Sequence, residues 1–135
     1  MAPVRTLIVD DRSDVRYLIR AIVADSGLDL EVVGEADGAD AALQQLAALA
    51  PDVVVLDARM PGMDGFEAAP LLLARRPGLG IVLCSAWVDE EIRRRAAAAG
   101  IGDVLSKDRF DEIPAAVARA ARRSGARPGG QTAGG

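Results

Sequence analysis

The sequence predicts an α/β domain whose five-stranded parallel sheet is doubly wound, with helices on both faces. Five short runs rich in Val, Ile and Leu alternate with five longer segments whose apolar residues recur at helical spacing. The short runs are almost continuously apolar, as expected for parallel strands buried on both faces. Only 3% of the residues are aromatic, so the core must be built from aliphatic side chains.

The strands and the domain limits follow from these runs. The predicted strands are Thr6–Val9, Leu30–Val33, Val53–Leu56, Ile81–Cys84 and Asp103–Leu105. At 135 residues the chain is long enough for one domain, which we expect over residues 1–123. Residues 124–135 are rich in Gly and are predicted to be a flexible tail or a truncated linker.

The first two helices are predicted from apolar stripes and from their end signals. Ser13 or Asp14 can cap the first helix, which should end near Gly27. Its stripe is Val15, Leu18, Ile19, Ile22 and Val23. The second helix carries a stripe of Ala39, Ala42, Leu43, Leu46 and Ala47 and should stop before Pro51.

The remaining helices contain two prolines that test the assignment. These helices are predicted at Gly65–Arg75, Asp89–Ala99 and Asp111–Arg123. Pro70 would clash with the carbonyl of Phe66, so we expect the third helix to start late or to kink there. Pro114 falls in the first turn of the fifth helix, where its missing N–H costs little.

Composition excludes several classes of function. A formal charge of −4 argues against direct nucleic-acid binding by this segment. The chain has no histidine, which excludes Ser-His and Cys-His nucleophilic pairs and histidine metal ligands. Cys84 is the only cysteine, so a cytoplasmic location is expected, with this thiol in the core. No apolar run reaches membrane length, and no membrane partner is expected.

Polar residues end four of the five predicted strands. Asp10 and Asp11 follow the first strand, Asp57 the third, Ser85 the fourth and Lys107 the fifth. The carboxyl ends of parallel strands share one edge of the sheet, so these side chains should meet there. Three carboxylates would repel one another without a cation, and Mg²⁺ prefers such ligands. With the hydroxyl and the ammonium group added, the set suits phosphoryl transfer to a carboxylate.

Four strings carry a resemblance to a known family. LIVDDRSDVR, VVVLDARMPGMDGFE, IVLCSA and LSKD resemble the response-regulator receiver family of two-component signalling, over residues 5 to about 123. The resemblance implies the flavodoxin-like strand order 2-1-3-4-5. It also implies that Asp57 accepts a phosphoryl group from a partner histidine kinase or phosphotransfer protein, with Ser85 and Lys107 contacting that group. The implied Mg²⁺ site consists of Asp10, Asp11, Asp57 and the backbone carbonyl of Arg59, in which Asp11 binds the ion directly and Asp10 acts through water or by orienting a ligand.

Two positions near this predicted site are unusual. Val104 stands three residues before Lys107, where the family usually has the Tyr or Phe that swings inward on phosphorylation. The usual aromatic switch is therefore not expected. Trp87 follows Ser85 by two residues and is either an exposed loop aromatic or a lid beside Asp57.

Other interpretations of the sequence are either still open or disfavoured. A phosphorylation-independent interaction module of the same fold would usually have lost one of the acids or the lysine, and none is lost. Asp108 replaces a common proline, as in relatives that continue into a DNA-binding domain, so the chain could be the receiver part of a transcriptional regulator. An aspartyl-phosphate enzyme would need a second acid where Arg59 stands, so no catalysis beyond the chain's own phosphoryl transfer and dephosphorylation is expected. The output could be a downstream protein or an output domain absent here, and a homodimer stays open.

Overall fold

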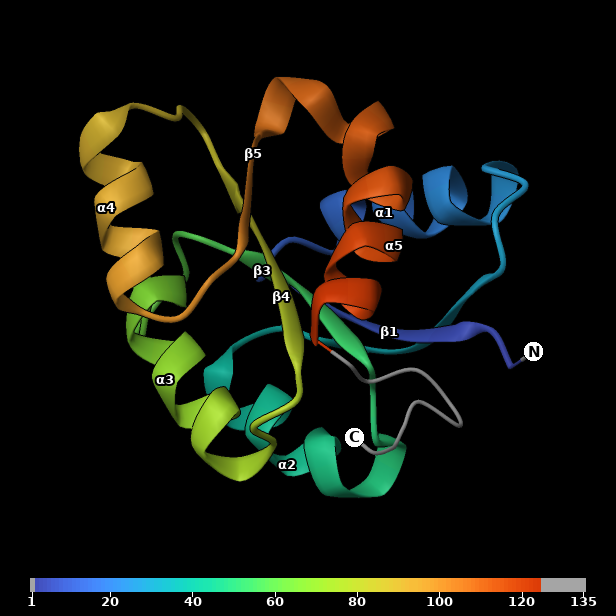
Figure 1. Ribbon diagram of the computed structural model, residues 1–135, viewed down its shortest axis with the longest axis horizontal. Helices are drawn as coiled ribbons and strands as arrows, with labels where there is room; N and C mark the ends of the chain where they lie inside the picture. The colour runs from blue at the N-terminus through green and yellow to red at the C-terminus, as the bar shows by residue number, and fades with distance from the viewer. Residues whose placement is uncertain (1, 125–135) are drawn as a thin grey trace.

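A computed structural model describes residues 2–124 as five parallel strands with helices on both faces (Figure 1). The sheet order is β2-β1-β3-β4-β5, which confirms the predicted flavodoxin-like order. The strands are β1 (Val4–Val9), β2 (Leu30–Ala36), β3 (Val53–Asp57), β4 (Gly80–Ser85) and β5 (Asp103–Ser106). No helix among residues 2–124 is long and apolar enough to span a bilayer.

The sheet separates two apolar cores. Helices α1 (Ser13–Asp25) and α5 (Ile113–Ser124) cover one face, and α2 (Ala39–Leu49), α3 (Gly65–Arg75) and α4 (Glu90–Ala98) cover the other (Figure 1). Side chains of β3 alternate between them: Val53 and Val55 face α1 and α5, whereas Val54 and Leu56 face α2 and α3. Both cores are almost wholly aliphatic, as the composition requires.

Only the inner strands match the prediction of burial on both faces. Every residue of β3 and β4 is buried, while the edge strands β2 and β5 are partly exposed. The prediction also ended β2 three residues too early. Its ladder with β1 continues to the pair Val9–Ala36, because backbone pairing carries the strand through the polar Glu35.

The start of α1 corrects the predicted cap. Arg12, not Ser13 or Asp14, precedes the first helical residue, and its side chain makes no capping bond. The Asp10 carboxylate accepts the Arg12 N–H at 2.9 Å, which fixes the turn before Ser13 is reached. Leu18 of the predicted stripe is 46% exposed, since α1 packs mainly through Ile19 and Val23. In α2, Ala47 is likewise exposed.

The expected late start of α3 is wrong. The helix begins at Gly65 and runs through Pro70, so of the two expected outcomes only a kink at Pro70 stays a prediction. Asp64 and Glu67 form a capping box, with bonds of 2.8 and 2.9 Å, that fixes the first turn. Buried contacts of the helix then outweigh the one hydrogen bond that Pro70 cannot make.

The last helix is preceded by a segment that the sequence patterns did not indicate. A 3₁₀ segment, η1, spans Lys107–Glu112, and α5 starts at Ile113 rather than at Asp111. Pro114 has no N–H for the carbonyl of Phe110, and the N–H of Ile113 bonds to it instead in the tighter 3₁₀ pattern. The place of Pro114 in the first turn is confirmed. Ser124 ends α5, and the rest of the predicted tail, residues 125–135, lies outside the described residues.

Candidate functional site

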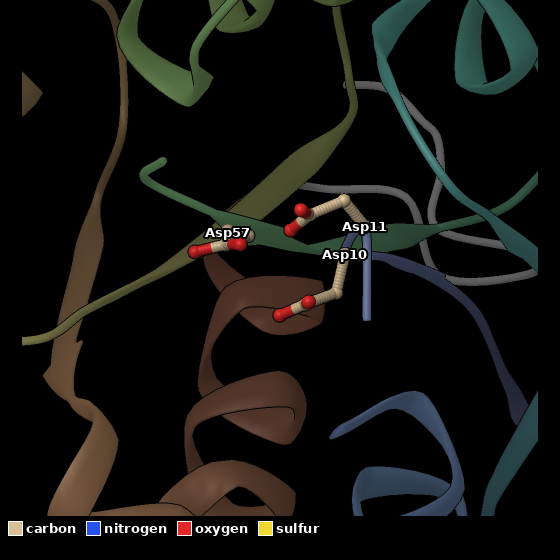
Figure 2. Close-up of side chains that lie close together, drawn as sticks. All are labelled: Asp10, Asp11 and Asp57. Atoms are coloured by element: carbon tan, nitrogen blue, oxygen red, sulfur yellow. The ribbon is translucent and has the colours of Figure 1, made fainter. Parts of the chain in front are cut away.

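Three carboxylates meet at the carboxyl edge of the sheet, as the strand ends predicted (Figure 2). One oxygen each from Asp10, Asp11 and Asp57 lie within 4.8 Å of one another. Asp10 and Asp57 are buried and Asp11 is exposed. The loop that leaves β1 supplies the first two acids and the end of β3 supplies the third. Because these strands are neighbours in the sheet, residues 47 positions apart become a cluster.

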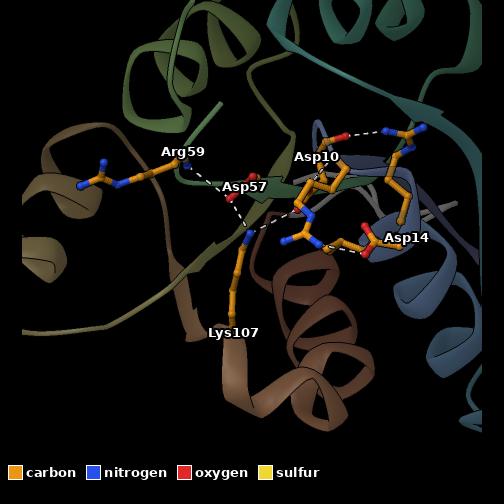
Figure 3. A network of polar contacts seen from close by, with 8 residues as sticks. Asp10, Asp14, Asp57, Arg59 and Lys107 are labelled. Carbon is orange, nitrogen blue, oxygen red and sulfur yellow. Dashed lines mark hydrogen bonds and ion pairs between the residues drawn. The ribbon is translucent and has the colours of Figure 1, made fainter. Parts of the chain in front are cut away.

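Lys107 bridges two of the three acids (Figure 3). Its Nζ lies 3.0 Å from Oδ1 of Asp57 and 3.5 Å from Oδ2 of Asp10. It comes from the end of β5, two strands away from β3. One ammonium group against three carboxylates leaves a local excess of negative charge, which favours a further cation.

The protonation equilibria reflect this crowding. Burial raises the pKa of Asp57, and the charge of Asp10 adds to it, while the hydrogen bond from Lys107 only partly opposes them. Burial by itself would lower the pKa of Lys107. Its hydrogen bond and charge attraction to Asp57 outweigh burial, so the pKa of Lys107 is raised and the ammonium form is favoured.

Backbone groups and one arginine orient the acids. The Arg59 N–H donates to Oδ1 of Asp57 at 3.2 Å, just as the Arg12 N–H holds Asp10. Arg16 reaches from α1 and donates to the carbonyl oxygen of Asp10 at 2.7 Å. Its Nε also donates to Glu35 on β2 at 2.9 Å. Nothing in the sequence spacing indicated Arg16 as a support of this site.

The donor set fits a hard divalent cation. Three carboxylate oxygens converge, and Asp11 is exposed, so water or phosphate oxygens can complete a shell around an ion. The structure gives no contact for the carbonyl of Arg59, and its place among the ligands stays a prediction.

Ser85 and Trp87 line a common cavity with the residues that directly follow Asp57. Ser85 is buried at the end of β4, adjacent to β3 in the sheet. It lines a cavity of about 590 Å³ together with Arg59 and Trp87. Trp87 is 52% exposed, and the Cζ of Arg59 lies 5.5 Å from the centre of its ring. The Arg59 side chain therefore points away from Asp57, as Figure 3 shows.

Two further residues complete the surroundings. Cys84, paired with Asp57 across β3 and β4, is buried in the core as expected. Burial raises the pKa of its thiol to about 12, which makes it a poor nucleophile. Val104 is half-buried and lines a second cavity of about 580 Å³, which Trp87 also lines.

A family model for the response regulator receiver domain matches residues 6–118. The chain belongs to this family. The receiver is 36% identical over 119 residues to the chemotaxis protein CheY of Listeria monocytogenes, an alignment that covers 87% of this chain and 98% of that protein.

A second relative of the receiver is much longer. The receiver is 37% identical over 110 residues to a protein-glutamate methylesterase/protein-glutamine glutaminase of Bradyrhizobium diazoefficiens. That alignment covers 80% of this chain but spans only 30% of the relative's length. Among solved structures, the NarL signal receiver domain of Mycobacterium tuberculosis superposes with a TM-score of 0.82 at 36% identity, covering 90% of this chain and 98% of that one.

Proposed function

We propose that the receiver is a phosphorylation switch in which Asp57 accepts a phosphoryl group from a partner histidine kinase or phosphotransfer protein. The observation that carries the proposal is the bridge of Lys107 between Asp57 and Asp10 inside a cluster of three acids. An ammonium group held beside a buried carboxylate, with two more acids near, supplies a nucleophile and a counter-charge for a phosphoryl group.

Each residue of the site has a distinct part in this reaction. A carboxylate oxygen of Asp57 attacks phosphorus, the bond from phosphorus to the donor nitrogen breaks, and the donor imidazole keeps the electron pair. Asp11 and Asp57 would hold Mg²⁺ directly with the Arg59 carbonyl as the third protein contact, and Asp10 would act through water or by orienting a ligand. When bound, the ion neutralises the phosphoryl oxygens. Ser85 donates its hydroxyl to one phosphoryl oxygen, and Lys107 pairs with another.

Phosphorylation is tested directly with a small acyl phosphate donor plus Mg²⁺. Intact mass should rise by one phosphate, and removal of the ion with a chelator should prevent the gain. The Asp57→Asn variant should gain nothing, whereas Asp52→Asn, which changes an acid away from the cluster, should label like the parent. Equal labelling of parent and Asp57→Asn would contradict the assignment.

The proposal also implies which partners the receiver has, which reactions it does not catalyse and where in the cell it acts. Residues 1–123 act as one receiver unit, and a downstream protein or an output domain reads its state. The chain catalyses only its own phosphoryl transfer and dephosphorylation, since Arg59 occupies the position where an aspartyl-phosphate enzyme needs a second acid. We place it in the cytoplasm, where a lone, buried Cys84 would stay reduced.

A further inference from the structure

Trp87 lines two cavities. The first, of about 590 Å³, opens beside Arg59 and Ser85 at the site. The second, of about 580 Å³, opens beside Val104 and Ser106 on β5. The segment that carries Trp87, residues 86–89, is neither helix nor strand. A large side chain that stands on such a segment and lines two cavities has two places in which to lie.

A weak cation–π contact with Arg59 orients the indole at the first cavity. The guanidinium carbon of Arg59 lies 5.5 Å from the ring centre, near the outer limit of a cation–π contact. The backbone N–H of the same residue is hydrogen bonded to Asp57. The Arg59 side chain is exposed, so it can turn toward Asp57 without leaving a buried position.

The second cavity offers an indole ring both apolar and polar contacts. Its apolar lining includes the half-buried Val104, the buried Leu105 and Val88. Its polar lining includes the charged Arg93, Arg109 and Glu112, and the cavity is open to solvent. Asp108 lines the same cavity and offers an acceptor for the indole N–H, which a buried tryptophan needs. A larger residue at position 104 would fill this space, and valine leaves it open.

We propose that Trp87 moves between these two cavities and that Arg59 determines which one it occupies. For its trigger the inference rests on the proposed function. A phosphoryl group carries roughly −1.5 to −2 charge and lies beyond the carboxylate of Asp57, where it attracts the Arg59 guanidinium away from the ring. The released indole then gains apolar contact over Val104. Phosphorylation is thereby transmitted to the surface between α4 and β5, although position 104 has no aromatic residue.

The first experiment needs no phosphorylation. Trp87 is the only tryptophan, so acrylamide quenching of its emission reports its exposure alone. Arg59→Ala should lower the quenching constant roughly twofold, because one face of the half-exposed indole then packs against Val104 and Leu105. Arg95→Ala is the matched control: it removes another arginine of the first cavity, one that stacks on Phe66 at 4.1 Å, and should leave quenching unchanged.

A second substitution, at position 104, tests whether the indole moves into the second cavity. Val104→Phe should fill the second cavity, so the double variant Arg59→Ala/Val104→Phe should quench at least as strongly as the parent. Far-UV circular dichroism checks that the double variant is folded. If it is not folded, Val104→Leu takes the place of Val104→Phe in the experiment. The inference is overturned if Arg59→Ala quenches like the parent, or if filling position 104 leaves the reduced quenching in place.

Beryllofluoride with Mg²⁺ mimics a phosphoryl group on Asp57 and so tests whether phosphorylation causes Trp87 to move. It should lower quenching in the parent and not in Val104→Phe, with occupancy of Asp57 followed separately by fluorine NMR. Failure of Asp57 to bind the mimic or to take phosphate by mass would count against the proposed function, while the Arg59→Ala result would still decide the movement. Full occupancy with unchanged quenching would overturn the coupling between Asp57 and Trp87.

Discussion

At the residue scale, single charges in this receiver are held by partners from distant parts of the chain. Lys107 contacts acids from two other strands, and Arg16 links the Asp10 carbonyl to Glu35. Arg20 also donates to Glu35, at 2.8 Å. Such shared partners orient the site without adding a residue to it. Glu35 lies outside the cluster of Asp10, Asp11 and Asp57, so its contribution to stability can be measured with all three of these residues in place.

The stability supplied by Glu35 should depend on pH. Burial by itself would raise its pKa, but the hydrogen bonds from Arg20 and Arg16 outweigh burial and lower it. A carboxylate whose folded pKa is depressed stabilises the fold above the unfolded pKa, about 4.3, and loses this effect as the pH falls through the folded pKa. Glu35→Gln should therefore lower the free energy of unfolding by about 1 kcal/mol at pH 7.

The pH dependence of this stabilisation is checked by urea unfolding of the parent and of Glu35→Gln at several pH values. The difference between them should shrink as the pH falls below about 4, where the parent carboxylate becomes protonated. Glu31→Gln, at an exposed position of the same strand, is the control and should show little difference at either pH. A difference for Glu35→Gln that stays constant with pH would rule out the ion pairs as its cause.

At the scale of single elements, local end signals fix where helices begin, even against an unfavourable residue further on. The capping box of α3 places its start directly after the loop that follows Asp57. Gly65 is essential there because a Cβ would collide with the carbonyl oxygen of Asp57. The helix start and the site are thus packed against each other.

Removal of the cap should destabilise the receiver. Asp64→Ala removes the acceptor for the Glu67 N–H and should lower the free energy of unfolding by about 1 kcal/mol, as for other N-caps. Glu67→Ala removes only the return bond to the Asp64 N–H and should cost less. Denaturant unfolding measures both. Equal stability of Asp64→Ala and the parent would show that packing alone fixes this helix.

At the scale of the whole molecule, long-range pairs tie the last helix to the far edge of the sheet. Asp103 is buried at the start of β5. It accepts hydrogen bonds from Arg119 and Arg123, two successive turns along α5. The carboxylate thus joins the last strand to the C-terminal half of the last helix.

This triad should behave as one unit in mutational cycles. Asp103→Ala should lower the free energy of unfolding by about 1–2 kcal/mol, a value moderated by the half-exposed arginines. Arg119→Ala and Arg123→Ala should each cost less, since the other arginine still pairs. In the Asp103→Ala background, Arg123→Ala should cost almost nothing more, as measured by urea unfolding. Additive losses would mean that the arginines act through packing and not through Asp103.

The sequence by itself determined the alternation of elements, the strand order by resemblance, and the strand ends at which the acids, Ser85 and Lys107 stand. These follow from local patterns, because burial on both faces makes a strand continuously apolar and parallel strands present their carboxyl ends at one edge. The family assignment rested on the same residues and is confirmed by the match over residues 6–118.

The tertiary structure alone decided which groups share a partner across the fold. The helix starts that the residue patterns missed, at α1, α3 and α5, depend instead on local bonds to Asp10, Glu67 and Phe110. By contrast, Arg16 behind Asp10 and Arg59 over Trp87 are contacts between separate elements. Hydrophobic periodicity records which face of a segment is buried, but it carries no information about the partner that a polar side chain meets across the fold.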